Sequence, residues 1–342
     1  MALAVTCIAS NRNPALFLQD PSFRYRCENL ALALQDQGWN SQLTHLRDGT
    51  TAQTGQVVVF HRPKASARLA WLLWRLRRRG AVPVADFDDL VFDPELASHS
   101  PAVINGILPL RKVRHAFAAH GKALEWFDRV TVSTVPLQEH LQRIYPAQRV
   151  TVVPNAVHHS WLRHPIPAAG PAAPRIITYF PGTRSHDHDF QMIVPVLEQL
   201  LAEYPQLQLH ITGQLQPKMH TARKQLVLHE RVPFTDYARF VQRGWLNLAP
   251  LQDTPFNHCK SALKAIEAGF WGIPTVCSPI PDMLRFTAAG AAIVPTESAW
   301  LETLERVLDP SASRAAAGEL RERVLALAHP ALMAEAFLTS LD

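Results

Sequence analysis

The chain has 342 residues, of which 47% are hydrophobic and 18% are charged, and its formal net charge is +5. This composition excludes an intrinsically disordered chain, and the length suffices for two domains of ordinary size. No stretch of about 20 apolar residues is present, so we expect no membrane-spanning helix. The positive charge indicates an anionic partner, such as a nucleotide-sugar or a phospholipid surface.

The first half of the chain alternates strand and helix patterns, which is typical of a parallel sheet. The predicted strands are Val5–Ala9, Leu43–Leu46, Gln56–Phe60, Ala81–Asp86, Val130–Ser133 and Val150–Val153. The predicted helices between them are Phe23–Gln37, Lys64–Arg79, Arg111–Phe127 and Pro136–Ile144. The start of the chain lacks the basic region of a signal peptide, and the four cysteines lack metal-site spacing, so we expect a cytoplasmic protein with reduced thiols.

A proline-rich stretch from Trp161 to Pro174 predicts a linker. A second series follows, with strands Arg175–Phe180, Leu207–Thr212, Leu226–His229, Trp245–Ala249, Thr275–Ser278 and Ala291–Val294. Its predicted helices are Asp189–Glu203, Asp236–Gln242, Ser261–Trp271 and the interrupted stretch Trp300–Leu341. The sequence therefore predicts an α/β protein with two Rossmann-like, doubly wound domains facing a cleft. The expected boundaries are 1–157 and 174–325, with a C-terminal helix over 326–342 that crosses back to the first domain.

The helix Ser261–Trp271 carries the strongest functional pattern. Lys260, Lys264 and Glu267 are spaced i, i+4, i+7 and share one face. The free N–H groups at the helix start and the Ser261 hydroxyl suit a phosphate, and a carboxylate two turns on can accept hydrogen bonds from a ribose. The pattern predicts a nucleoside diphosphate lying along the helix. The alternative is a surface helix with solvated lysines and a salt-bridging glutamate.

This stretch resembles the donor-binding helix of bacterial GT-B glycosyltransferases of the group 1, family-four type. The matching residues follow the pattern FN..KS..K..E and are Phe256-Asn257, Lys260-Ser261, Lys264 and Glu267, with Gly272-Ile273-Pro274 after them. Where the family has a second glutamate, this chain has Cys259. The resemblance implies the GT-B fold, a nucleotide diphosphate sugar as donor, no required metal or other cofactor, and sugar transfer with retention.

The turn after the predicted strand Arg175–Phe180 is a second candidate for donor binding. Gly182, Thr183 and Arg184 form a turn whose backbone N–H groups can approach an anion. The alternative is an ordinary turn in which Asp189 caps the next helix, and we expect Asp189 to be such a cap.

The same turn resembles the GT..H..D motif of this glycosyltransferase branch, with Gly182, Thr183, His186 and Asp189 at the matching positions. Many relatives carry an Arg and a Lys here that neutralise the donor diphosphate. This chain lacks that pair, so the positive charge is expected from Arg184, Lys260 and Lys264. His186 is a candidate catalytic residue.

Three carboxylates lie at the end of the predicted strand Ala81–Asp86, where side chains face the cleft of such a fold. Asp86, Asp88 and Asp89 resemble the D.DD signature of the same enzymes. Asp88 and Asp89 are candidates for binding acceptor hydroxyls or for acting as a base. The alternative is a structural turn, but clustered carboxylates repel each other and cost stability, which favours a functional role.

Other side chains are expected to face the same cleft. Arg24 and Arg26 begin the first helix and can contact a phosphate or a sugar carboxylate, although solvated surface arginines are the alternative. His61 ends a strand and is a candidate acceptor contact or a packed histidine. Asn155 lies in a stretch that resembles a hinge motif of the superfamily, and it can bond across the hinge.

The predicted helix Lys64–Arg79 interleaves tryptophans with arginines. Such a helix can lie on an anionic bilayer, which would place the protein at the inner face of the membrane. The alternative is an ordinary helix with its apolar side on the sheet, which we favour. No nucleic-acid-binding motif is present, so we expect no nucleic-acid partner.

The sequence therefore predicts a glycosyltransferase that moves a sugar from a nucleotide diphosphate sugar to a glycan, lipid-linked or protein acceptor, in glycan or surface polysaccharide synthesis. Two alternatives belong to other classes. One is a GT-B-type sugar-nucleotide epimerase, and the other is a catalytically silent partner of a polysaccharide assembly complex.

Overall fold

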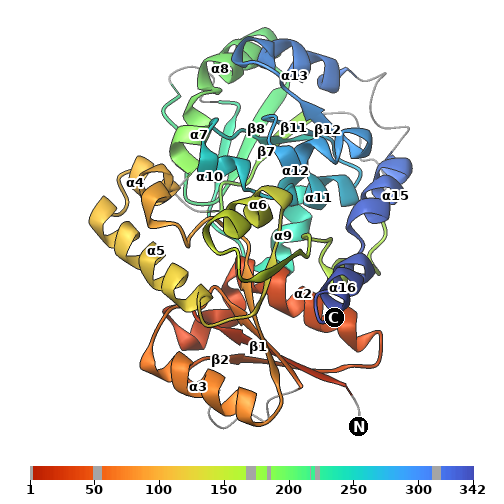
Figure 1. Ribbon diagram of the computed structural model, residues 1–342. Coiled ribbons are helices and arrows are strands. Elements are labelled where there is room, and N and C mark those ends of the chain that lie inside the picture. The colour runs from red at the N-terminus through yellow and green to blue at the C-terminus, as the bar shows by residue number, and fades with distance from the viewer. Residues whose placement is uncertain are drawn as a thin grey trace.

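The computed structural model describes residues 3–48, 56–166, 175–182, 186–215, 217–219, 224–309 and 317–342. The chain folds around two sheets, which lie one above the other in Figure 1 with helices around each. Each sheet has six strands among the described residues. The predicted α/β class with two doubly wound halves is confirmed.

The first sheet has the order β2-β1-β3-β4-β5-β6, and all neighbouring strands are parallel. Its strands are β1 (Ala4–Ala9), β2 (Asn40–His45), β3 (Val57–His61), β4 (Val82–Phe87), β5 (Arg129–Val132) and β6 (Arg149–Val152). β3 is buried along its whole length, because helices cover both faces of a parallel sheet. His61 and Asp86 are paired at the ends of β3 and β4, so their side chains meet at the carboxyl edge.

The helices of this first domain are α1 (Pro21–Phe23), α2 (Asn29–Gln35), α3 (Ala67–Arg78), α4 (Pro101–Ile104), α5 (Leu110–Leu124) and α6 (Val135–Ile144), with 3-10 turns η1 (Pro14–Gln19) and η3 (Pro94–His99). Ser66 caps α3 by accepting the Leu69 N–H at 3.2 Å. The single helix predicted over Phe23–Gln37 is divided by a π-helical section, η2 (Arg24–Glu28).

The second sheet has the order β12-β11-β10-β7-β8-β9 and is also parallel. Its strands are β7 (Arg175–Tyr179), β8 (Leu207–Thr212), β9 (Leu226–His229), β10 (Leu246–Ala249), β11 (Thr275–Cys277) and β12 (Ala291–Ile293). Its helices are α7 (Asp187–Gln191), α8 (Val194–Glu203), α9 (Phe234–Val241), α10 (Pro255–His258), α11 (Leu263–Phe270), α12 (Pro281–Leu284), α13 (Trp300–Leu308) and α15 (Ala317–Ala328), with 3-10 turns η6 (Thr287–Ala289) and η7 (Glu297–Ala299).

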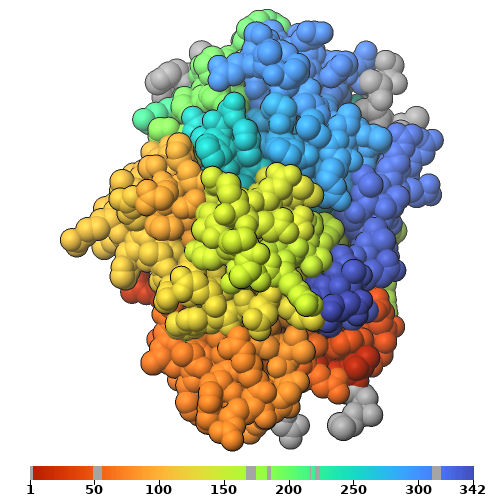
Figure 2. Space-filling view, viewed as in Figure 1, coloured from red at the N-terminus to blue at the C-terminus, as the bar shows by residue number. Residues whose placement is uncertain are grey.

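The last helix, α16 (Pro330–Thr339), packs on the first domain although it follows the second in sequence. Met333, Ala334 and Phe337 lie in one buried cluster with residues of β1, β3 and α2. The helix runs down beside α2 in Figure 1, and the same dark blue segment touches the lower domain in Figure 2. α16 therefore ties the two domains together.

The two domains also touch where α6 faces the 255–260 stretch. Thr134, the N-cap of α6, donates its hydroxyl to the Cys259 carbonyl at 2.9 Å. In Figure 2 the second domain sits directly on the first at this place. Over the ranges given above, no helix is both long and apolar enough to cross a bilayer.

Candidate functional site

The segment of residues 260–267 lies at the carboxyl edge of the second sheet, after β10 and α10. Thr254 begins the turn, since its hydroxyl accepts the Asn257 N–H at 3.1 Å. The segment faces the first domain, because Lys260 pairs with Asp89 at 2.9 Å. The predicted donor residues therefore lie opposite the predicted acceptor residues.

The helix of this segment starts later than predicted. α11 begins at Leu263, not at Ser261, and the N–H of Ala262 before it donates to Asp282 Oδ2 at 2.7 Å. No acceptor among the described residues takes the backbone N–H groups of Leu263 and Lys264. The Asp282 carboxylate thus accepts the hydrogen bond of the first amide, that of Ala262. The amides of Leu263 and Lys264 remain as donors for a ligand.

Ser261 does not cap the helix. Its Oγ accepts a hydrogen bond from Asn155 Nδ2 at 2.8 Å, and its side chain is partly buried. The bond across the hinge that the sequence predicted for Asn155 is therefore made, and it ends on a predicted donor residue.

Of the two lysines in this segment, Lys260 has an anionic partner and Lys264 has none among the described residues. Among the residues that the structure describes, no carboxylate is paired with its ammonium group. Burial lowers the pKa of Lys264, and the charge of Lys260 lowers it further, while Glu267 acts in the opposite direction. A partly buried ammonium in this state favours an anionic ligand.

His186 and Asp189 form a hydrogen-bonded pair next to these lysines. His186 Nδ1 lies 2.8 Å from Asp189 Oδ2. Burial and the charges of Lys264 and Lys260 lower the pKa of His186, although the hydrogen bond to Asp189 raises it. The neutral imidazole then donates from Nδ1 to the carboxylate and keeps a lone pair on Nε2.

Asp189 is not the helix cap that the sequence predicted. It lies within α7, and its Oδ1 accepts the Gln252 N–H at 2.9 Å and Asn257 Nδ2 at 3.1 Å. Gly182, whose φ is 73°, makes the left-handed turn after β7. Thr183 and Arg184 lie outside the described residues.

Glu267 is enclosed by two tyrosines. Its Oε1 accepts a short hydrogen bond from the Tyr25 hydroxyl, and its Oε2 accepts one from the Tyr237 hydroxyl at 2.9 Å. The residue is 7% exposed, and burial raises its pKa although both tyrosines and Lys264 lower it. Tyr237 belongs to α9 of the same domain, whereas Tyr25 comes from the first domain. The predicted ribose contact is therefore occupied.

Arg26 is a buried structural residue of the first domain, so the predicted contact with an acceptor does not fit its position. It is 2% exposed and binds Asp86 through Nε at 3.2 Å and Nη2 at 2.6 Å. Its Nη1 donates to the Val153 carbonyl at 2.5 Å and to Asn155 Oδ1 at 3.1 Å. These bonds leave the guanidinium without a face for a ligand.

His61 is likewise buried, at 4% exposure, and both of its ring nitrogens have partners. Nδ1 lies 3.1 Å from Asp86 Oδ2, and Nε2 lies 2.8 Å from Ser22 Oγ. The Ser22 hydroxyl in turn donates to Asp88 Oδ2 at 2.5 Å. His61 therefore joins two of the clustered carboxylates and does not itself face a ligand.

Asp88 and Asp89 are held by Arg62, which the sequence did not single out. Arg62 Nε donates to Asp88 Oδ1 at 2.6 Å and Nη2 to Asp89 Oδ2 at 3.0 Å. Burial by itself raises the pKa of Asp88, but Arg62 and His61 lower it well below its usual range. Arg62 is the only non-glycine residue with positive φ among those described, at 44°. Its backbone is therefore strained in the conformation that lets the guanidinium bind both aspartates.

Arg24 differs from Arg26 in that its side chain reaches the domain boundary. It pairs with Glu28 at 2.8 Å and lies over the Phe234 ring of α9 at 4.5 Å. Its side chain is 20% exposed. It stays a candidate ligand contact.

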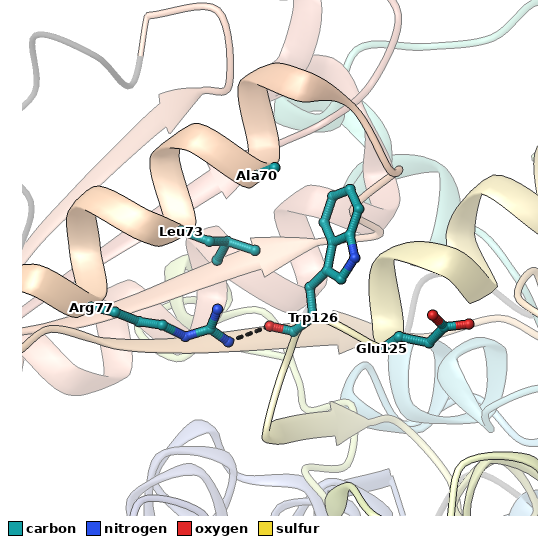
Figure 3. Close-up of a pocket in the computed structure, with 5 residues that line it drawn as sticks. All are labelled: Ala70, Leu73, Arg77, Glu125 and Trp126. Carbon is teal, nitrogen blue, oxygen red and sulfur yellow. Dashed lines mark hydrogen bonds between the residues drawn. The ribbon is translucent and has the colours of Figure 1, made fainter.

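The pocket drawn in Figure 3 lies away from these residues. It is a hollow between α3 and the residues that follow α5, lined by Ala70, Leu73, Arg77, Glu125 and Trp126. Arg77 donates to the Trp126 carbonyl across it. None of the predicted catalytic, donor or acceptor residues lines this pocket.

Solved structures share this architecture. Sucrose-phosphate synthase from Thermosynechococcus elongatus is 16% identical over 98% of this chain and 98% of its own, with a TM-score of 0.65. The pneumococcal O-GlcNAc transferase GtfA in complex with UDP and GlcNAc is 11% identical over 83% of this chain and 56% of its own, with a TM-score of 0.58. The fold is GT-B.

A third GT-B structure has a different described activity. A protein from Listeria monocytogenes described as a UDP-N-acetylglucosamine 2-epimerase is 13% identical over 100% of this chain and 96% of its own, with a TM-score of 0.57. No family model and no curated protein matches the sequence. At these identities the likeness to solved structures shows the GT-B fold alone.

Proposed function

We propose that this protein is a glycosyltransferase of the group 1, family-four type. It moves a sugar from a nucleotide diphosphate sugar to an acceptor hydroxyl with retention, in glycan or surface polysaccharide synthesis. The GT-B fold supports a sugar-nucleotide enzyme, and the FN..KS..K..E pattern supports the branch. The proposed acceptor is a glycan, a lipid-linked sugar or a protein, and the reaction needs no cofactor besides its donor.

One observation carries the proposal. Lys264 is a partly buried cation without a paired carboxylate in the described part of the chain, and its own N–H and that of Leu263 lack acceptors there. A partly buried charge of this kind is costly unless an anionic ligand satisfies it. The two amides are open to acceptor atoms of the same ligand. A diphosphate supplies two negative groups with several acceptor oxygens, which match an ammonium beside a helix start.

The proposed donor site combines this helix start with its neighbours. Further contacts to the diphosphate come from Lys260 and Ser261, and from Gly182, Thr183 and Arg184. Glu267 accepts the ribose hydroxyls. As the bond between sugar and phosphate breaks, negative charge grows on the departing diphosphate. Lys264 and the amides of α11 stabilise that charge.

The proposed acceptor side lies across the domain boundary. Asp88 and Asp89 bind the acceptor hydroxyl from the first domain. His186 of the second domain, held neutral with a lone pair on Nε2, accepts its proton. Arg24 is a further contact. Arg26 and His61 act through Asp86, as positioning residues, because their polar atoms are engaged inside the first domain.

A sugar-nucleotide epimerase is the second candidate function, favoured by the likeness to the Listeria structure. An epimerase changes the sugar of its nucleotide without any acceptor, whereas a transferase releases the nucleoside diphosphate only when an acceptor takes the sugar. A silent partner in an assembly complex would do neither.

The experiment is mass spectrometry of UDP-, GDP- and ADP-sugars incubated with the protein, with and without a panel of acceptor glycans. Acceptor-dependent release of a nucleoside diphosphate, with a glycan heavier by one sugar, is the expected result. Conversion of the sugar without acceptor would favour the epimerase. No change in any nucleotide-sugar, together with no binding by calorimetry, would favour the silent partner.

A membrane contact through α3 is part of the proposal for lipid-linked acceptors. Trp71 and Trp74 are 43% and 54% exposed, and Arg75 and Arg78 lie over their rings. Exposed tryptophans among arginines suit the interface of an anionic bilayer. Sedimentation with vesicles of anionic and of neutral lipid tests this, since only the anionic vesicles are expected to retain the protein.

A further inference from the structure

Three of the proposed donor residues are bound to side chains of the first domain. Lys260 pairs with Asp89 at 2.9 Å, Ser261 accepts from Asn155 at 2.8 Å, and Glu267 accepts from Tyr25. Each of these pairs crosses the boundary between the domains. Lys264 differs, because no side chain of the first domain binds it within the described residues.

The Tyr25 contact bears most directly on ligand access. A ribose can reach Glu267 in the proposed way only through the carboxylate oxygens. Both already accept a tyrosine hydroxyl, and the residue is only 7% exposed, so its remaining lone pairs are not open to solvent. Tyr237 is part of the second domain and moves with Glu267. Tyr25 is the partner that separates from Glu267 if the domains part.

Tyr25 is packed from both sides of the domain boundary, because Phe234 belongs to α9 of the second domain. It lies in the π-helical section η2, it is 3% exposed, and its ring meets His158 and Phe234 edge to face at 5.7 and 6.0 Å between centroids. Its neighbour Arg26 is locked onto Asp86. A π-helical section places consecutive residues on different faces, and such sections recur at functional sites. Tyr25 therefore cannot leave Glu267 by a change of its own side chain alone without disturbing this packing.

We propose that Tyr25 is an internal competitor of the donor, which holds the Glu267 carboxylate in the free protein and is displaced when the ribose binds. This inference rests on the proposed function and names the regulation of the same site. Donor binding then exchanges the Tyr25 hydroxyl for a ribose hydroxyl on Glu267. It also draws Lys260 from Asp89 towards the diphosphate, so that Asp89 becomes available to the acceptor only after the donor has bound.

The test is isothermal titration calorimetry of UDP, GDP and ADP with the wild-type protein and with two matched variants. Tyr25→Phe and Tyr237→Phe each remove one hydroxyl from the same carboxylate. If Tyr25 competes with the donor, Tyr25→Phe binds the preferred diphosphate about tenfold more tightly, since a hydrogen bond to a charged group no longer has to be broken. Tyr237→Phe, whose hydroxyl belongs to the donor's own domain, does not bind more tightly.

Wild-type protein that binds a diphosphate, with Tyr25→Phe binding it equally or less tightly, overturns the inference and leaves the proposed function standing. Absence of binding by all three proteins removes the proposed function, and the inference with it. Binding by Tyr25→Phe alone supports both.

A second measurement needs no variant. Hydrogen exchange of the backbone amides of Arg24–Glu28 is followed in the wild-type protein with and without the bound diphosphate. Faster exchange in the complex is expected, because Tyr25 loses its partner in the second domain. Unchanged or slower exchange contradicts the displacement of Tyr25.

Discussion

Two charged residues of α11 have opposite surroundings although they are one turn apart. Each carboxylate oxygen of Glu267 accepts a hydrogen bond from a tyrosine hydroxyl. The ammonium of Lys264 has no paired carboxylate in the part of the chain that the structure describes. Burial disfavours both charged forms, since it lowers the pKa of Lys264 and raises that of Glu267. Each charge therefore costs stability in the free protein, and this cost can be measured.

Replacing Lys264 by Met separates stability from binding. The free protein is expected to become more stable, because the variant no longer buries an ammonium whose pKa burial lowers. Its affinity for a nucleoside diphosphate is expected to fall about 10- to 100-fold, as for the loss of a charge-assisted hydrogen bond. Thermal unfolding and calorimetry measure the two effects. Lys260→Met is the control, since it loses only a partly exposed ion pair and changes stability by about 1 kcal/mol or less. A Lys264→Met protein that is less stable and binds equally well contradicts the assignment.

Glu267→Gln tests the charge of the second residue through its pH dependence. A carboxyl whose pKa is raised on folding binds more protons in the folded state, so its cost appears as pH rises from about 4.5 through the folded pKa. The variant is expected to be more stable than the wild type at pH 7, with a difference that shrinks as pH falls towards 4.5. Urea unfolding of both proteins at pH 5 and pH 7 measures this. A difference that is the same at both pH values shows that the charge is not responsible.

The position of helix α11 depends on the absence of a side chain at Gly269. A Cβ on Gly269 would lie 2.6 Å from Val324 Cγ2 of α15, and valine side chains are stiff. The two helices can approach closely only because this side chain is absent. The helix that carries Lys264 and Glu267 is thus held against α15.

Gly269→Ala is expected to destabilise the protein by about 1–3 kcal/mol, as overpacked sites do. The matched control is Gly318→Ala in α15, where a Cβ meets nothing within 4 Å. That change is expected to stabilise the protein by up to about 1 kcal/mol, because alanine favours the helix. Chemical denaturation of both variants measures the difference. Equal effects of the two substitutions would show that the contact with Val324 does not limit the packing.

The observed elements agree closely with the predicted ones where a single sequence pattern determines the element. The strands are runs of Val, Ile and Leu bounded by polar turns, and β8 and β9 have the predicted ends. The predicted start of α11 is wrong by two residues, because Asp282, distant in sequence, accepts the hydrogen bond of the Ala262 amide. The sequence does not predict the π-helical section η2, because the apolar spacing of Phe23, Cys27 and Leu30 suits an ordinary helix as well.

At the scale of the whole molecule, the alternation of strands and helices was sufficient to predict two doubly wound halves. The contacts that define the site could not be predicted in the same way. Tyr25 and Glu267 are 242 positions apart, and neither has a local pattern that indicates the other. The sequence offers one indication of a role for Arg62, which is its position beside His61 at the end of a predicted strand. The domain boundaries at 157 and 174 stay a prediction.

The return of α16 to the first domain has a measurable consequence. Phe337 is fully buried in the cluster with β1 and β3, so Phe337→Ala is expected to cost about 3–5 kcal/mol. Leu332 of the same helix is 38% exposed, and Leu332→Ala is expected to change stability by about 0.5 kcal/mol or less. Thermal unfolding compares them. Equal losses would indicate that α16 does not pack on the first domain.

A crystal structure of the protein with its preferred nucleoside diphosphate would show where the diphosphate binds. We expect phosphate oxygens within hydrogen-bond distance of Lys264 Nζ and of the amides of Leu263 and Lys264, with a ribose hydroxyl on Glu267 in place of Tyr25. A diphosphate bound away from α11, with Lys264 still unpaired, would contradict this expectation.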